Sequence, residues 1–183
     1  MTYAVTSRRI SDAGFHDATG LQSGALELLC LARDAAQMPA AIGCFNRAGA
    51  EVRTARSLRV LFAAAYAESA ARQILLLDIE PHNGISGLFD RLTRLRQEKP
   101  EVVVILASAM TRTDDLDTTR LAICDATVRL PVSAARFHNA LDAAMMNNMT
   151  WCVRQIKLAA EQGAAFAPSG FEAANSMSAM RMA

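Results

Sequence analysis

The stretch Gln73-Ile-Leu-Leu-Leu-Asp78, followed by Ile-Glu-Pro-His-Asn-Gly-Ile-Ser-Gly87, decides the fold of this 183-residue chain. A short continuous apolar run that turn residues close is typical of a strand buried on both faces, and such strands occur in parallel sheets. Asp78 follows the apolar run directly and therefore lies at the carboxyl end of the strand. In an open α/β sheet, this edge is where ligands bind.

Four other segments have the composition of strands, and helical segments alternate with them. The predicted strands are 26–32, 51–55, 74–78, 102–107 and 126–130. The predicted helices are 39–48, one that begins at Ser57, 88–99, one that Thr113-Asp114-Asp115 opens, and one that Ser133 caps. Five strands alternating with five helices predict an α/β fold, a flavodoxin-like doubly wound parallel sheet of order 2-1-3-4-5.

Composition excludes several classes of partner. The net charge is +1, so the chain lacks the basic surface that binding to nucleic acid or to an anionic membrane requires. No apolar run approaches the ~20 residues of a membrane-spanning helix. The four cysteines are far apart in the sequence and indicate buried, reduced thiols (Cys30, Cys44, Cys124 and Cys152). We therefore expect a cytoplasmic protein.

Three regions are predicted along the chain. Residues 1–24 lack periodicity and are interpreted as a flexible N-terminal arm, and residues 25–146 as the α/β domain. Residues 147–183 are expected to hold a C-terminal helix to about 162 and a disordered tail. A 4-3-4-3 spacing in that helix resembles a coiled-coil seam, formed by Met145, Met149, Cys152, Ile156 and Ala159. The alternative is a helix that folds back on its own domain.

The loop after the central strand carries a family resemblance. Asp78, then Pro81, then Gly84-Ile-Ser-Gly87 resembles the phospho-acceptor loop of bacterial response-regulator receiver domains. Gly87 lies nine residues after Asp78, so the loop is one residue longer than the family pattern. The resemblance covers roughly residues 25–146 and implies that Asp78 is the phospho-acceptor candidate.

Other family positions are matched or replaced. The resemblance implies that Asp34 is the second acid of the acidic pocket and that Ser108 stands at the switch-hydroxyl position. Arg33 replaces the first acid and Leu130 replaces the family lysine. Pro131 matches a proline that usually follows a cis peptide bond, so it is the cis-proline candidate.

The replacements change what the site can bind. Phosphoryl transfer to a carboxylate requires Mg²⁺, which prefers an octahedron of oxygen ligands. Asp34 and Asp78 remain as candidate Mg²⁺ ligands, but Arg33 removes an oxygen ligand and supplies a cation of its own. Leu130 removes the ammonium that pairs with the phosphoryl group. We therefore expect a degenerate pseudo-receiver site, closed by a protein charge.

Three functions follow as hypotheses. The first is a stand-alone atypical receiver-like module that acts by protein–protein interaction in a bacterial two-component-type pathway, without enzymatic activity or a cofactor. The second is a response regulator that still accepts phosphate at Asp78 from a histidine kinase or phosphotransfer protein, with Mg²⁺. The third is a flavodoxin-like small-ligand-binding domain or enzyme. Expected partners are a kinase, a phosphotransfer protein or a regulator, and the C-terminal helix also suggests a homodimer.

Two weaker signals receive ordinary interpretations. His82 is interpreted as a solvent-facing loop residue, because it has no neighbouring ligand at metal-binding spacing. The basic residues Arg91, Arg94, Arg96 and Lys99 are interpreted as the solvated face of a helix.

Overall fold

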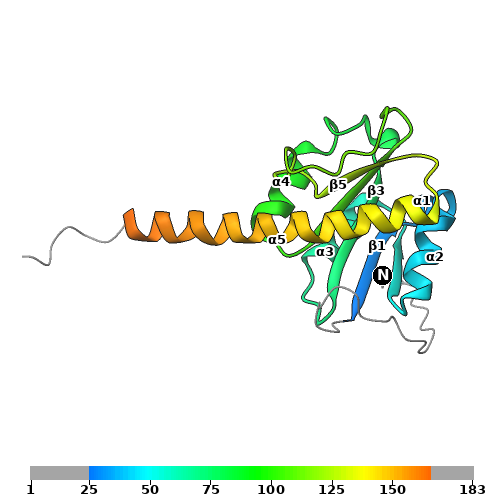
Figure 1. Ribbon diagram of the computed structural model, residues 1–183. Coiled ribbons are helices and arrows are strands. Elements are labelled where there is room, and N and C mark those ends of the chain that lie inside the picture. Colours follow the sequence, from blue (N-terminus) through cyan, green and yellow to red (C-terminus); the bar gives the residue numbers. More distant parts are fainter. Residues whose placement is uncertain (1–24, 166–183) are drawn as a thin grey trace, which may run out of the picture.

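The computed structural model describes residues 25–165, which fold around one five-stranded parallel sheet of order β2-β1-β3-β4-β5 (Figure 1). The elements are β1 (Leu26–Leu31), α1 (Ala32–Gln37), α2 (Pro39–Arg47), β2 (Glu51–Ala55), α3 (Leu58–Tyr66), β3 (Arg72–Asp78), the 3-10 helix η1 (Glu80–His82), α4 (Phe89–Glu98), β4 (Val103–Ser108), β5 (Ala126–Arg129) and α5 (Ala134–Ala165). The predicted fold class and strand order are confirmed. The expectations for residues 1–24 and 166–183 lie outside the described residues.

Strand β3 is buried on both faces, as its apolar run predicts. Ile74 and Leu76 belong to one core, which α2 and α5 cover, through residues such as Phe45 and Phe137. Leu75 and Leu77 belong to a second core, which α3 and α4 cover. All four β3 side chains are fully buried. Helices on both faces are what a parallel sheet with apolar strands requires.

The prediction of a helix that begins at Thr113 is wrong. Residues 109–125 form an irregular loop, because the acids that suggested a helix N-terminus make tertiary contacts instead. The carboxylate of Asp114 accepts the backbone N–H of Arg129 at 2.7 Å and the Nε–H of Arg136 at 3.0 Å. Asp115 forms an antiparallel bridge with Thr127, with both N–O distances 2.8 Å. These contacts hold the loop against β5 and the start of α5.

Two further local features differ from the prediction. The segment after β1 forms the short helix α1, where a loop was expected, and Pro39 then begins α2. The four cysteines are free, but only Cys30 and Cys124 are buried, whereas Cys44 and Cys152 are half-buried.

Helix α5 is longer than the domain that it covers. It has 32 residues, which corresponds to about 48 Å at 1.5 Å per residue. Phe137, Ala140 and Ala144 are fully buried against the sheet. Figure 1 shows the C-terminal half of α5 projecting beyond the other elements. No helix within residues 25–165 is long and apolar enough to cross a membrane.

Candidate functional site

Two acids meet at the carboxyl edge of the sheet. Strands β1 and β3 are neighbours, so Asp34, in the first turn of α1, lies beside Asp78, the last residue of β3. The Asp34 Oδ2 atom accepts the backbone N–H of Asp78 at 3.1 Å. Asp34 is fully buried and Asp78 is 5% exposed. The structure therefore brings together the two acids that the sequence singles out.

Arg33 supplies a cation to this pair. Its Nε–H donates to Asp34 Oδ1 at 3.3 Å, while 47% of its side chain stays exposed. Burial raises the pKa of the Asp34 carboxyl, and the charge of Asp78 adds to this effect. The N–H of Asp78 and the guanidinium of Arg33 lower that pKa. Asp34 is therefore a buried acid whose two oxygens are both held by groups of the protein.

The loop after β3 is compact because its backbone folds back on itself. The backbone N–H of Glu80 donates to Asp78 Oδ1 at 3.1 Å. Asn83 and Gly84 adopt left-handed conformations, with φ of 61° and 66°. At Gly87, an added Cβ would lie 1.9 Å from the carbonyl oxygen of His82. Only glycine fits this close approach, which explains the glycine at the end of the loop.

His82 does not face solvent as the sequence interpretation expected. Its Nε2 atom is buried and has no hydrogen-bond partner within the described part of the chain. Burial lowers the pKa of His82, and the charge of Arg33 lowers it further, whereas Asp34 and Asp78 raise it. The half-buried imidazole therefore lies within reach of the same cluster of charges.

Ser108 is engaged by an acid that the sequence interpretation missed. Ser108 ends β4, next to β3 in the sheet, and is 2% exposed. Its hydroxyl donates to a carboxylate oxygen of Glu80 and accepts the N–H of Met110 at 3.0 Å. The signal for Glu80 was present in the sequence, because it is an acid two residues after Asp78 on the same loop. The hydroxyl at the predicted switch position is thus already hydrogen-bonded to a carboxylate of the same chain.

The end of β5 is apolar. Leu130 is half-buried and packs against the core, and its N–H donates to the carbonyl of Ser108 at 2.8 Å. The Leu130–Pro131 peptide bond is cis, as expected. The position of the family lysine therefore holds a packed apolar side chain.

The donor set at this edge does not fit a magnesium site. Within residues 25–165, no group of three or more His, Cys, Asp or Glu side chains is arranged to hold a metal ion. Of the two candidate ligands, Asp34 is already bound by Arg33 and by the N–H of Asp78. Mg²⁺ requires near-octahedral oxygen coordination, which a guanidinium beside the carboxylates opposes. The cluster is instead a carboxylate pair in which the guanidinium of Arg33 contacts Asp34 and the backbone N–H of Glu80 contacts Asp78.

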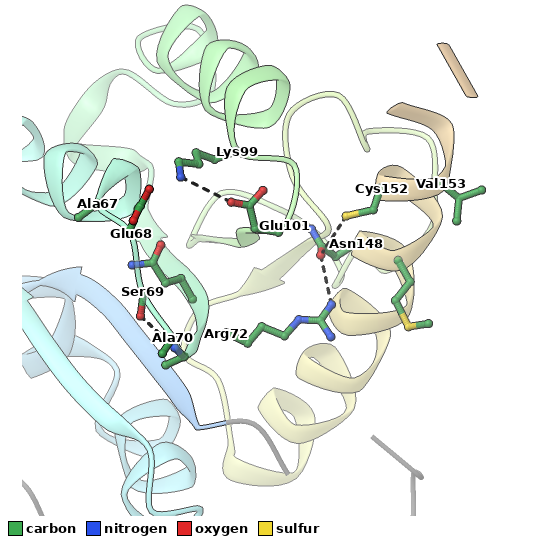
Figure 2. A pocket seen from close by; sticks show the side chains of 13 residues that line it. Ala67, Glu68, Ser69, Ala70, Arg72, Lys99, Glu101, Asn148, Cys152 and Val153 are labelled. Carbon is green, nitrogen blue, oxygen red and sulfur yellow. Dashed lines mark hydrogen bonds and ion pairs between the residues drawn. The ribbon is translucent and has the colours of Figure 1, made fainter. Parts of the chain in front are cut away.

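A cavity of about 720 Å³ lies at the opposite edge of the sheet, near the start of β3 and β4 (Figure 2). Three of its charged side chains contact neighbours. Arg72 donates to Asn148 Oδ1 at 3.2 Å, and the Lys99 ammonium lies 3.8 Å from Glu101. Because the cavity is remote from Asp78, the acid cluster and the cavity are separate features.

Arg96 is buried, so the interpretation of all four basic residues as a solvated face is wrong. Its guanidinium is bidentate with Asp125, at 2.7 and 2.9 Å, and both side chains are fully buried. It lies 5.1 Å from the ring centroid of Trp151, whose Nε1–H donates to the Arg96 carbonyl at 2.9 Å. Asn148 donates to Asp125 at 3.4 Å and to the Pro100 carbonyl at 2.9 Å.

We call Arg96, Asp125, Asn148 and Trp151 the Arg96 network. It ties α5 to α4 and to the segment before β5 at the place where α5 leaves the domain. The network therefore fixes the direction of the projecting half of α5.

Comparisons with known proteins add little beyond the fold. No protein-family model matches the sequence, and no curated protein matches it. Among solved structures, the chain is similar to NtrX from Brucella abortus, crystallised in complex with ADP, with 21% identity and a TM-score of 0.48. The match covers 78% of this chain and 29% of that one, so this chain spans less than a third of that protein. We base no functional inference on a likeness of this size.

Proposed function

We propose that this chain is a receiver-like interaction module of a two-component-type signalling pathway, one that phosphoryl transfer does not switch. The observation that carries the proposal is the Asp34 carboxylate, which is shared between the guanidinium of Arg33 and the backbone N–H of Asp78. This internal neutralisation replaces the external cation that phosphoryl transfer to a carboxylate needs. The chain would then act by binding a signalling protein, such as a histidine kinase, a phosphotransfer protein or a regulator, without enzymatic activity of its own.

Two other contacts support the same proposal. The Ser108 hydroxyl is held by the carboxylate of Glu80, an anion that would repel an incoming phosphoryl group at that position. Leu130 places an apolar side chain where a cation would be needed to pair with that group. An entering phosphoryl group would therefore meet the Glu80 carboxylate and no ammonium.

The second candidate function is a response regulator that still accepts phosphate at Asp78. The observation in its favour is the position of Asp78, the last residue of β3 at the carboxyl edge of the sheet, beside the strand that carries Ser108. The third, a small-ligand binder of the flavodoxin-like type, expects a cavity at this edge. The cavity described above lies at the other edge, so we do not pursue this function.

Incubation with beryllofluoride and Mg²⁺, followed by backbone amide NMR, separates the first two candidates. We expect no saturable shift of the amides around Asp78. Saturable shifts with a normal Mg²⁺ requirement would overturn the proposal in favour of the phosphorylated regulator.

A gain-of-function variant tests the cause. Arg33→Asp with Leu130→Lys restores an oxygen ligand and an ammonium, so we expect it to gain measurable beryllofluoride binding. The matched control is Arg59→Asp with Leu130→Lys, which makes the same charge change at an exposed position on α3. Equal behaviour of the two double variants would show that Arg33 is not what closes the site.

A further inference from the structure

We infer that the projecting half of α5 is an interface between two copies of this chain. Four large apolar side chains are exposed along one line of the helix, and we call them the α5 seam: Met146 is 61% exposed, Met149 45%, Val153 50% and Ile156 70%. Their 3-4-3 spacing matches the alternation of three- and four-residue steps in the heptad repeat of a two-stranded coiled coil. On an ordinary surface, exposed apolar residues are scattered singly, whereas these four lie next to one another in a line.

The α5 seam differs from the line that the sequence predicts. The predicted line includes Met145 and Cys152, but the domain itself takes up both positions. Met145 packs against the core, and the Cys152 thiol donates to the carbonyl of Pro100 at 3.3 Å. Figure 2 shows Cys152 turned toward the loop before β4 and Val153 turned away from it. The accessible seam is therefore rotated about the helix axis, away from the domain.

The direction of the seam leaves room for a second copy. Successive residues of an α-helix are about 100° apart, so Val153 lies on the opposite side of α5 from Ala144, which is buried against the sheet. A partner that contacts the seam therefore approaches from the far side of the helix. Two copies can dock through their α5 helices with the two sheets on the outside of the pair.

The charge pattern favours an identical partner. None of the four seam residues is charged, and the preceding turns of the same face carry Asn139 and the acid Asp142, which pairs with His138. At the seam's edge stands Lys157, and the neighbouring outer positions hold one residue of each sign, Arg154 and Glu161. Two identical copies repeat every charge, so an uncharged face is one that they can share without like-charge repulsion. A partner chosen by its opposite charge would instead require a rim of one sign, whereas this rim carries both signs.

The seam is also continuous with the cavity at the root of α5. Met149 and Val153 belong to the seam and line that cavity. Figure 2 shows Val153 at its rim. A second α5 helix on the seam would therefore lie over two of the side chains that line the cavity. Beyond the domain, the free part of α5 is about as long as the ~12–15 residues at which isolated helices are marginal in water. Pairing supplies the packing that such a helix needs.

The test is sedimentation of the full chain over a range of concentrations. Because the seam is short, we expect a dimer with a dissociation constant of roughly micromolar order. Ile156→Glu places a charge in the seam, and we expect it to weaken the dimer by about tenfold or more.

The matched control is Leu158→Glu. Leu158 is 49% exposed but lies off the seam, so the same change there should leave the dimer intact. Thermal melts of both variants show whether the domain still folds. A full chain that stays monomeric at high micromolar concentration, or equal effects of the two variants, would overturn the inference.

Discussion

Replacing Arg96 by leucine should destabilise the domain strongly and in a pH-dependent way. In the folded chain the Arg96 guanidinium is fully buried and donates to four acceptors. Two are the oxygens of Asp125, and the others are the carbonyls of Val102 and Leu121, both at 3.0 Å. Arg96→Leu keeps an apolar stem against Trp151 but leaves the Asp125 carboxylate buried without its cation.

The expected loss follows from this geometry. Removing one partner of a fully buried ion pair typically costs about 3–5 kcal/mol, because the other charge stays desolvated. For a chain of this length, each kcal/mol corresponds to about 2–4 °C in Tm, so we expect a decrease of roughly 6–20 °C. The double variant Arg96→Leu with Asp125→Asn removes both charges, and the new amide still accepts the backbone N–H of Val104. We expect it to recover at least about 1 kcal/mol of the loss.

The pH dependence has a definite sign. Burial raises the pKa of the Asp125 carboxyl to about 6, against the lowering effect of Arg96. Without Arg96, this pKa rises further above the value in the unfolded chain. A carboxyl with a raised folded-state pKa contributes stability at low pH that is lost as pH rises through that pKa. The deficit of Arg96→Leu should therefore be larger at pH 8 than at pH 5.

Urea unfolding of the wild type, the single variant and the double variant at both pH values measures these terms. A loss below about 1 kcal/mol, or a deficit that grows toward low pH, would refute the view that Arg96 and Asp125 form a buried pair that stabilises the domain.

Two further predictions concern the loop after β3. Gly87→Ala should destabilise the domain by about 1–3 kcal/mol in urea unfolding, because the new Cβ would clash with the His82 carbonyl. The control is Gly43→Ala within α2, whose Cβ meets only the flexible end of Arg47 and which should be neutral or stabilising by up to about 1 kcal/mol. Equal effects of the two variants would contradict the close approach at Gly87. Burial and then Arg33 hold the pKa of His82 below its ordinary value, so the stability that the neutral imidazole contributes is present above pH ~6.5 and is lost as pH falls through the folded-state pKa. Arg33→Gln should raise that pKa in an NMR titration of His82, and an unchanged titration would place Arg33 away from the imidazole.

The sheet was predictable because its strands carry their signal locally. The run from Ile74 to Leu77 is apolar at every position, which only a strand covered on both faces can use in a parallel sheet. The convergence of Asp34 and Asp78 follows from the same rule, since the carboxyl ends of neighbouring parallel strands share one edge. These features needed no knowledge of any contact far along the chain.

Two of the wrong predictions share a physical cause, because each concerns a charged residue whose partner is distant in the sequence. Arg96 resembles its exposed neighbour Arg94 in sequence, but its partner Asp125 is 29 residues away and lies inside the domain. The acid Asp114 suggested a helix N-terminus, yet its partner Arg136 is 22 residues away, on α5. Local propensity describes the chain before tertiary contacts form, and a buried or tertiary ion pair overrides it.

The two proposals together imply a particular kind of regulation. On the proposed function, Arg33 and Glu80 satisfy the groups that Mg²⁺ and a phosphoryl group would otherwise bind, so these ligands cannot shift the domain between two states unless they bind the states differently. The remaining variable is association through the α5 seam, where a weak dimer responds to the concentration of the chain itself. Because the Arg96 network fixes the direction of α5, the seam keeps its orientation whether or not a partner is bound. Ile156→Glu should therefore change association without altering the amide spectrum around Asp78, whereas a receiver that phosphorylation switches would link the two.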